Sequence, residues 1–410
     1  MKAALPILLI AVVAGVAFAS IAWHPAIEPV AVARPDDALV KRGAALAAIG
    51  DCVVCHTSPG GAGYAGGRKL ATPFGAIYSS NITPDPETGI GGWSLAAFVR
   101  AMRQGVDRRG RNLYPALPYD HFTRVTDEDL AALYAFLMAG QPVRATTPAN
   151  ALPFPLTWRP LLAGWNLLFL DDRRYQPDPS HDAAWNRGAY LVEGLGHCGA
   201  CHTPRNSFGA ETAGKALIGG EAEGWSAPPL AGAPWTEASL YAYLRTGLDT
   251  HHGAAAGPMA PVTWNLGRAP DEDVRAMATY LASMTAPAGQ PPATDNSVMA
   301  DSPGAEIFAG SCSSCHGAAA PMTANGAPSL ALSSTLQSGE PGNLLHVILG
   351  GIRPEHYRAG PQMPAFSAIL QDDQLVELAT YLRAHFAPDQ PTWTDLPDAV
   401  HRVRTEGNAS

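Results

Sequence analysis

The alternation of apolar and polar positions repeats three times along the chain. In each repetition, an apolar helical segment carries an aromatic residue beside a leucine, and acidic residues open the same helix a few positions earlier. The apolar segments are 132–137, 278–281 and 379–382, and the acidic positions are 127–129, 271–273 and 372–373. Acidic side chains complement the positively polarised N-terminus of a helix, so the pattern predicts three closing helices.

Two further helices are predicted in each repetition. Middle helices are expected at 94–104, 237–246 and 343–349, and each runs into a glycine. Entry helices are expected at 39–46, 186–191 and 303–308. Each entry helix contains a glycine, which allows another helix to cross it closely; these are Gly43, Gly188 and Gly304. We expect the closing helix to be the crossing partner. The chain is therefore predicted to be an all-α protein of three repeats, at 37–145, 180–286 and 301–388.

An uncharged apolar run occupies residues 3–23. About 20 such residues suffice to cross a bilayer as a helix. Lys2 precedes the run, and Asp36 and Asp37 follow the linker at 24–36, which places the bulk of the chain outside the cytoplasm. We favour an uncleaved anchor at 1–23, and the alternative is a signal peptide cleaved near Ala17-Phe18-Ala19. Both alternatives export the protein.

The connectors between the repeats differ in character. The first, at 146–179, is Pro-rich and contains an apolar stretch at 158–170 that is too short to span a membrane. This stretch either packs between the repeats or contacts a partner subunit or the membrane surface. The second connector, at 287–300, is polar. Residues 389–410 are expected to form a polar tail without a second membrane segment.

Composition narrows the class of protein. Of the 410 residues, 47% are hydrophobic and only 15% are charged, and the formal net charge is -9. These values exclude a disordered chain and argue against a nucleic-acid-binding protein. The 41 glycines and 37 prolines indicate that much of each repeat is loop.

One motif, Cys-x-x-Cys-His, occurs once in each repeat and accounts for every cysteine. Its copies are Cys52, Cys55 and His56; Cys198, Cys201 and His202; Cys312, Cys315 and His316. Two thiols on one helical turn can each add to a vinyl group of the same porphyrin, and the histidine then becomes the proximal iron ligand. A zinc site would need a second pair of ligands near each motif, and a redox dithiol has no obligatory histidine. The sequence therefore predicts three covalently bound haem c groups.

A methionine before the closing helix is the expected sixth iron ligand, typical of an electron carrier. Met259 and Met363 occupy corresponding positions in the loops of the second and third repeats. Met277 and Met322 are expected to be core residues. His251 and His252 lie near Met259, and we expect them to form a solvated loop pair.

The first repeat departs from this pattern, because Leu117 stands where Met363 would align. Leucine cannot bind iron. An unligated or weakly ligated first haem is one possibility, and the candidate sixth ligands are Met102, His121 and Met138.

Several stretches together resemble the triheme cytochrome c subunits of bacterial membrane-bound dehydrogenases. They are Thr72-Pro73-Phe74-Gly75, Asn81-Ile82-Thr83-Pro84-Asp85, residues 114–119, Thr203-Pro204-Arg205, Gly219-Gly220 and Gly224-Trp225, with the three haem motifs in this order. The resemblance covers about residues 37–390. It implies three tandem cytochrome c-like haem domains at the periplasmic face of the bacterial inner membrane.

The resemblance also implies partners. Members of this family carry electrons from flavoproteins or quinoproteins that oxidise alcohols, gluconate or sorbitol, or from molybdenum hydroxylases acting on aldehydes and N-heterocycles. The acceptor is ubiquinone or an oxidase. The N-terminal anchor, the expected absence of a C-terminal hydrophobic or amphipathic segment and the ending around Trp393 resemble the cytochromes of molybdenum aldehyde dehydrogenases. The resemblance therefore favours such a dehydrogenase as the catalytic subunit, with a small iron-sulfur subunit as a possible third component.

We therefore expect an electron-transfer subunit that is not itself the dehydrogenase. No Gly-x-Gly-x-x-Gly that would indicate a dinucleotide site follows a predicted strand. The competing hypothesis is a haem peroxidase-like enzyme that uses a five-coordinate first haem.

Overall fold

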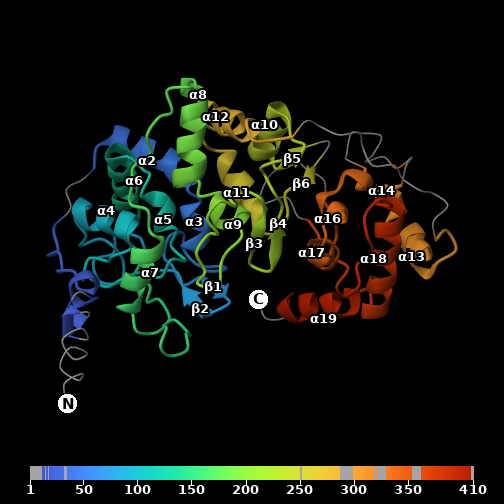
Figure 1. Cartoon of the computed structure of the whole chain (residues 1–410), viewed down its shortest axis with the longest axis horizontal. Helices are drawn as coiled ribbons and strands as arrows, with labels where there is room; N and C mark the ends of the chain where they lie inside the picture. The colour runs from blue at the N-terminus through green and yellow to red at the C-terminus, as the bar shows by residue number, and fades with distance from the viewer. Residues whose placement is uncertain are drawn as a thin grey trace, which may run out of the picture. The chain divides into compact units, whose positions relative to one another are not determined.

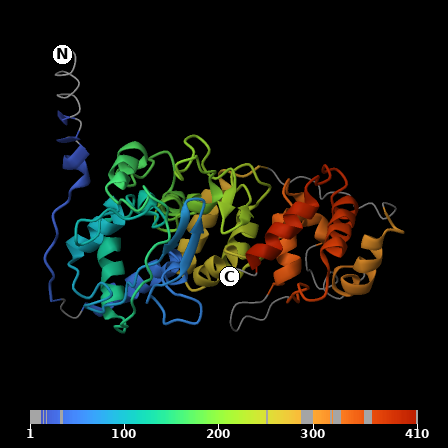
Figure 2. The same cartoon turned by 90° about the horizontal axis from the view of Figure 1, so that it is seen from below.

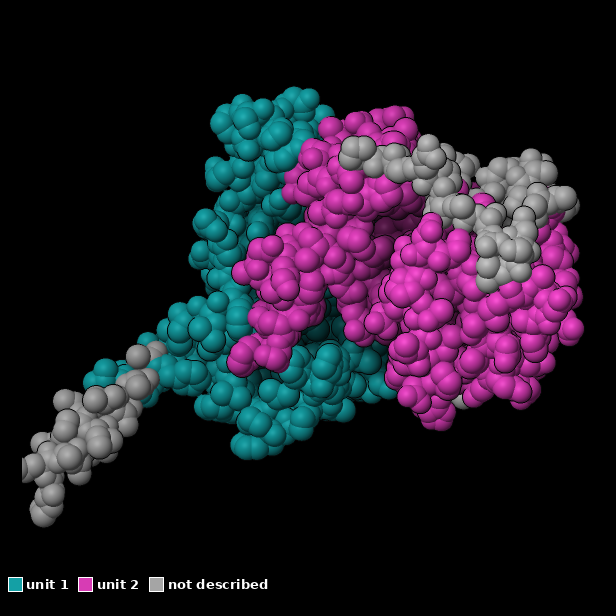
Figure 3. Space-filling model, turned by 45° about the vertical axis from the view of Figure 1, so that its right-hand side comes forward, with its two compact units in different colours: residues 1–200 teal, residues 201–410 magenta. Residues whose placement is uncertain are grey.

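The computed structural model describes residues 12–13, 15–16, 18–31, 35–249, 252–286, 299–317, 320, 329–352 and 362–407. Most elements are helices, as Figure 1 shows. The chain divides into two compact units, residues 1–200 and residues 201–410, which Figure 3 colours separately. This division falls inside the second predicted repeat, so the entry helix of that repeat belongs to the N-terminal unit.

The N-terminal unit contains one short hairpin and a series of helices. Its elements are α2 (Asp37–Ile49), α3 (Cys52–Cys55), β1 (Lys69–Thr72), β2 (Gly75–Tyr78), α4 (Leu95–Gln104), α5 (Tyr119–Phe122), α6 (Asp127–Ala139), α7 (Leu161–Phe169), α8 (Ala183–Tyr190) and the π-helix η1 (Leu191–Leu195). The predicted crossing of α2 and α6 is confirmed, since a Cβ atom on Gly43 would overlap the carbonyl group of Ala132.

The C-terminal unit holds the remainder of the second repeat and the third repeat. Its elements are α9 (Gly199–His202, which begins at the boundary), β3 (Gly220–Ala222), β4 (Trp225–Ala227), α10 (Glu237–Thr246), β5 (Leu248–Asp249), β6 (Gly253–Ala254), α11 (Met259–Leu266), α12 (Asp271–Ala282), α13 (Pro303–Ser311), α14 (Ser313–His316), the 3-10 helix η2 (Leu330–Leu332), α16 (Ser334–Gln337), α17 (Gly342–Gly350), α18 (Asp372–Phe386) and α19 (Leu396–Gly407). Helix α13 crosses α18 at Gly304, as predicted.

In each of the first two repeats, an arginine near the end of the middle helix joins this helix to the closing helix. Buried Arg103, near the end of α4, donates to the carbonyl of Val125 at 2.6 Å and pairs with Asp127, the first residue of α6. Arg245 occupies the same place in α10 and donates to the carbonyl of Ala269 at 2.7 Å. The arginine satisfies backbone carbonyls that would otherwise lack partners in the turn before the closing helix.

The mostly helical structure fits the predicted all-α class, and in the described residues three two-stranded antiparallel hairpins, β1–β2, β3–β4 and β5–β6, accompany the helices. The structure corrects two other expectations. The segment at Met259, expected to be a loop, begins α11. The expected polar tail contains α19, whose apolar residues Leu396, Val400 and Val403 are buried in the core of the third repeat. These three residues recur at helical spacing, so burial of one face stabilises α19 despite its polar composition.

Much of the predicted membrane segment, including residues 1–11, lies outside the described residues. Within the described part of the chain, no helix combines the length and the apolar character needed to cross a bilayer. Residues 287–298 of the second connector, His251 and Met322 also lie outside the described residues.

Candidate functional site

Each Cys-x-x-Cys-His motif lies on or beside a short helical turn. The turns are α3, α9 and α14, and none of the six cysteines, all of them among the described residues, forms a disulfide. Burial, followed by the neighbouring Asp51 and Cys55, raises the pKa of Cys52 to about 12, and burial raises the pKa of Cys312 to about 11. A reactive redox dithiol needs a lowered thiol pKa, so these raised values argue against that alternative.

The side chain of His56 is held by a single backbone acceptor. Its Nδ1 lies 2.6 Å from the carbonyl oxygen of Ser80. A carbonyl can only accept, so Nδ1 carries the proton and Nε2 keeps its lone pair. Burial lowers the pKa of His56, which favours the neutral ring even though the bond to Ser80 acts in the opposite direction. A neutral imidazole oriented through its second nitrogen is the usual state of a metal-binding histidine.

His202 in the second repeat has the same arrangement. Its Nδ1 lies 2.7 Å from the carbonyl oxygen of Pro228, and burial lowers its pKa. Ser80 closely follows strand β2 and Pro228 directly follows strand β4. In both repeats, therefore, a hairpin after the motif presents the carbonyl that orients the histidine.

The sequence around Ser80 explains how its carbonyl is positioned. Asn81 is buried, and its side-chain amide donates to the carbonyl of Val143 at 2.7 Å while its oxygen accepts from the backbone N–H of Thr83. Gly66 has a φ of +75°, and a Cβ atom there would meet the backbone N of Asn81 at 2.5 Å. A glycine and a buried asparagine thus let the two backbone segments lie against each other.

In the second repeat, other residues position the hairpin against the haem motif. Buried Thr203 accepts a hydrogen bond from the backbone N–H of Leu217 at 3.1 Å, and Gly219 donates to the carbonyl of His202 at 2.9 Å. A Cβ atom on Gly220 would overlap the carbonyl of Cys201. The strand β3 is thereby packed directly onto the turn that carries His202.

His316 in the third repeat is also a partly buried histidine, and burial lowers its pKa. Residues 318–319 and 321–328, which follow it, lie outside the described residues.

The two predicted methionine ligands are both half-buried, but their backbones differ. Met259 is half-buried at the start of α11. The preceding Gly257 has a φ of +52°, and a Cβ atom there would lie 2.7 Å from Cζ2 of Trp225, so the indole packs against this turn. Met363 is half-buried against the core of the third repeat and forms an antiparallel bridge with Ile352.

A glycine in the left-handed region ends each middle helix and lies against the segment expected to carry the sixth ligand. Gly105, Gly247 and Gly351 have φ values of +60°, +74° and +71°. A Cβ atom would meet the ring of Tyr119 in the first case, Oγ1 of Thr263 at 2.8 Å in the second, and the backbone carbonyl of Met363 in the third. The three repeats therefore bring the corresponding segments together by the same means.

The candidates in the first repeat lie on three different helices. Met102 and Met138 are half-buried on α4 and α6, and Leu117 is half-buried in the turn before α5. His121 is buried on α5, and its Nδ1 lies 2.8 Å from the carbonyl oxygen of Glu193. As in His56 and His202, a backbone carbonyl faces Nδ1 of His121 and leaves Nε2 with its lone pair.

The turn before the first motif contacts the turn before the second motif within the N-terminal unit. Nε2 of His197, the residue before Cys198, lies 3.3 Å from the carbonyl oxygen of Gly50, two residues before Cys52. The side chain of Leu195 covers Gly50, and a Cβ atom there would lie 3.1 Å from it. Neither His197 nor Gly50 stands out in the sequence as a site residue.

A second junction joins the second and third repeats within the C-terminal unit. The indole of Trp225 stacks on the ring of His346 from α17, with centroids 4.7 Å apart. The side chain of Asn343 donates to the carbonyl of Ser226 at 2.7 Å and accepts from its N–H at 2.8 Å. Trp225 therefore contacts both the turn before Met259 and the middle helix of the third repeat.

Two other features are structural. His252 stacks on Trp235 with centroids 3.5 Å apart, so it is not a solvated loop residue as expected. Met277 is 1% exposed, which confirms it as a core residue.

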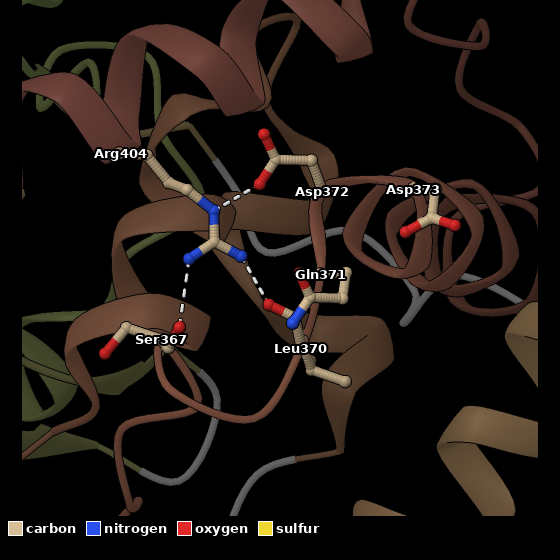
Figure 4. Close-up of a pocket in the computed structure, with 6 residues that line it drawn as sticks. All are labelled: Ser367, Leu370, Gln371, Asp372, Asp373 and Arg404. Atoms are coloured by element: carbon tan, nitrogen blue, oxygen red, sulfur yellow. Dashed lines mark hydrogen bonds and ion pairs between the residues drawn. The ribbon is translucent and has the colours of Figure 1, made fainter.

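A depression beside the third repeat is closed by Arg404, which pairs with Asp372 and donates to the carbonyls of Ser367 and Leu370 (Figure 4). These contacts attach α19 to the start of α18, and we assign this depression no ligand.

Protein-family models match residues in both compact units of the chain. Residues 40–141 match the family model described as cytochrome c, and residues 183–281 and 300–382 match that of cytochrome c oxidase, cbb3-type, subunit III. The chain is 48% identical over 408 residues to a nicotinate dehydrogenase subunit of Pseudomonas putida. The match covers 95% of this chain and 34% of that protein, so the chain spans about a third of that relative's length.

Two shorter relatives match over most of their length. The chain is 36% identical over 417 residues to the fructose dehydrogenase cytochrome subunit of Gluconobacter japonicus, covering 92% of this chain and 85% of that protein. It is 38% identical over 383 residues to the gluconate 2-dehydrogenase cytochrome c subunit of Pantoea cypripedii, covering 85% of this chain and 86% of that protein.

Proposed function

Because the chain belongs to the family of cytochrome c subunits of membrane-bound dehydrogenases, whose domains bind haem c covalently, we propose that it carries electrons away from a catalytic dehydrogenase subunit through three haems, one on each motif. The proposed thioether residues are Cys52, Cys55, Cys198, Cys201, Cys312 and Cys315. The proposed proximal ligands are His56, His202 and His316, and the proposed sixth ligands of the second and third haems are Met259 and Met363.

The orientation of the histidines is the observation that carries this proposal. The carbonyls of Ser80 and Pro228 hold the proton of His56 and His202 on Nδ1, which leaves Nε2 available for iron. The two cysteines of each motif, which form no disulfide, complete a donor set that fits a covalently attached haem. When bound, haem supplies the Fe(II)/Fe(III) couple. The chain's own residues fix the ring orientation, exclude water and set the spacing.

The two junctions between repeats support electron transfer from one haem site to the next. The contact of His197 with Gly50 brings the residues before the first and second motifs together. Trp225 and His346 connect the Met259 turn with the third repeat. We propose that electrons pass between neighbouring haems at these two places.

The sixth ligand of the first haem is a separate proposal. Met102, His121 and Met138 stay the candidates, together with a five-coordinate iron. The presence of Leu117 in place of a methionine favours a second candidate function, a haem peroxidase-like reaction at the first haem.

For the partner, we propose a molybdenum aldehyde dehydrogenase or a related hydroxylase of N-heterocycles. The similarity to the nicotinate dehydrogenase subunit supports this class. A flavin or quinoprotein dehydrogenase is the alternative, supported by the similarity to the fructose and gluconate dehydrogenase subunits. We place the complex at the periplasmic face of the inner membrane, held by residues 1–23, with a small iron-sulfur subunit as a further component and ubiquinone or an oxidase as acceptor.

Purification of the tagged full chain from membranes tests this proposal. We expect a dehydrogenase subunit to co-purify, and its molybdenum or flavin signal will identify the partner class. The chain alone should not oxidise ethanol, acetaldehyde or nicotinate with an artificial acceptor, and such oxidation would contradict the proposal.

The peroxidase-like function makes a different prediction. It requires a high-spin first haem that binds cyanide or peroxide, and turnover should be lost in a His56→Ala variant. A wholly low-spin spectrum that does not respond to these ligands would exclude it.

A further inference from the structure

Helix α7, in the connector after the first repeat, has one face that packs against the N-terminal unit. The side chain of Asn166 accepts a hydrogen bond from the hydroxyl of Tyr119 at 2.7 Å and donates to the carbonyl of Gln104 at 3.1 Å. Trp165 contacts the ring of Tyr119 edge-on, and Ala163 is buried. These contacts hold α7 in one orientation.

The other face of α7 and the segment before it expose large apolar side chains. Leu167 and Leu168 are 72% and 70% exposed, and Phe154 is 85% exposed. Trp158 is 50% exposed. A set of this kind on one connector is unusual for a surface in contact with water alone, and it indicates a surface that another phase or molecule covers.

Phe18, in the described part of the N-terminal apolar segment, lies next to this connector. The ring of Phe18 lies against that of Trp158, with centroids 5.9 Å apart. After this contact, the chain is tied to the first repeat: the carbonyl of Pro25 accepts from Arg100 at 2.7 Å, and the N–H of Ile27 donates to the carbonyl of Arg108 at 2.8 Å. The described part of the N-terminal segment, blue in both views, and the green connector lie on the same side of the unit in Figure 1 and Figure 2. A surface that covers Phe18 therefore also reaches Trp158.

Arginine accompanies the exposed apolar side chains. Arg159 stacks over the ring of Tyr114 at 4.7 Å and donates to the neutral carbonyl of Asn112 at 2.7 Å. Arg109 and Arg111, on the adjoining loop, are exposed, and Arg111 is paired with Asp107 at 2.7 Å. Arg159 and Arg109 therefore supply the local positive charge, in a chain whose net charge is -9. Arginine and tryptophan beside exposed leucine and phenylalanine suit the boundary between lipid headgroups and acyl chains.

We propose that the connector and the N-terminal apolar segment form one membrane-contact surface. The N-terminal segment is the anchor, and Phe154, Trp158, Leu167 and Leu168 enter the headgroup boundary of the same leaflet. Arg159 lies at the level of the lipid phosphates. This inference rests on the membrane location proposed above. It adds that α7 is a second, peripheral contact that fixes how the first repeat faces the bilayer.

A fluorescent label on α7 tests the inference in the full, haem-loaded chain. A Leu168→Cys variant in phosphatidylglycerol-containing proteoliposomes takes one polarity-sensitive, thiol-reactive dye, because the six native cysteines are consumed by thioether bonds. The matched control is Ile369→Cys, since Ile369 is 63% exposed and lies in the C-terminal unit. The haem absorption spectrum of each variant checks that it is folded.

The expected result is a blue-shifted emission at position 168 that nitroxide-labelled lipids quench strongly, with an unshifted and unquenched control. Equal behaviour of the two positions would overturn the inference. If the catalytic partner protein, rather than lipid, shields the dye at position 168 from water, the inference is also overturned. The surface is then assigned to a protein contact. Labelling of the unsubstituted chain would instead contradict covalent haem attachment, so failure of the proposed function is distinguishable.

Discussion

Replacement of Gly304 by alanine tests the helix crossing that supports the third motif. A Cβ atom at this position would lie 2.7 Å from Cβ of Tyr381 and 2.8 Å from the carbonyl carbon of Glu377, whereas ordinary van der Waals contact begins at 3.4 Å. Neither neighbour can rotate away, because one is backbone and the other is fixed to it. The carbonyl oxygen of Glu377 would lie closest of all to the added Cβ atom, so helices α13 and α18 must separate by roughly 1 Å in the variant.

The expected magnitude follows from two opposing terms. Overpacking costs roughly 1–3 kcal/mol, and the better helix propensity of alanine returns about 1 kcal/mol. Because the clash is with backbone, we expect the upper part of the range and a net loss of about 1–2 kcal/mol in the free energy of unfolding of the third repeat. A loss of this size increases the unfolded fraction roughly 5- to 30-fold.

Native-state hydrogen exchange of the haem-loaded chain measures this effect. The amides of α18 should exchange faster by that factor in Gly304→Ala, while those of α6 should not change. The control is Gly310→Ala in the same helix, where a Cβ atom would meet nothing within 4 Å. Exchange in Gly304→Ala as slow as in the parent chain, or equal acceleration in both variants, would refute the reasoning.

Three further predictions concern the haem sites. A Met363→Ala variant should lose the methionine-to-iron charge-transfer absorption of one haem and open that haem to cyanide, whereas Met277→Leu in the core should change neither; an unchanged spectrum in the first would contradict ligation by Met363. A His197→Ala variant loses the hydrogen bond to the carbonyl of Gly50, worth about 1 kcal/mol. It should keep its haems, but electrons should equilibrate more slowly between the first haem and the second haem after flash reduction. Unaltered equilibration would remove this junction from the path. Because burial lowers the pKa of His202, the unfolded chain binds more protons, so the urea midpoint of the haem-free chain should fall as the pH drops below about 6.5. A midpoint that rises on acidification would contradict this sign.

Much of the helical framework could be predicted from local signals. The middle helix of the second repeat has the predicted bounds, Glu237–Thr246, because Thr236 caps its start and Gly247 ends it in the left-handed conformation. The crossings at Gly43 and Gly304 were also predictable, since only glycine lets two helix backbones lie this close. The helix bounds depend on residues adjacent in the sequence, and each crossing depends on a glycine that has no Cβ atom.

The acceptors that orient the histidines could not be predicted in the same way. Ser80 and Pro228 act through backbone carbonyls, which any residue possesses, and their positions depend on the register of hairpins far along the chain. Turn residues such as Pro73 and Gly75 indicate a turn at the first hairpin, but they do not fix its register. The contact of His197 with Gly50 depends on the packing of two repeats, which no local pattern records.

The central claim, that this chain passes electrons between a dehydrogenase and an acceptor, is tested most directly by rapid mixing of the purified membrane complex with the substrate of its catalytic subunit while haem absorption is recorded. We predict that the haems become reduced at least as fast as the complex turns over, and that ubiquinone reoxidises them. Turnover of substrate with haems that stay oxidised would contradict the account.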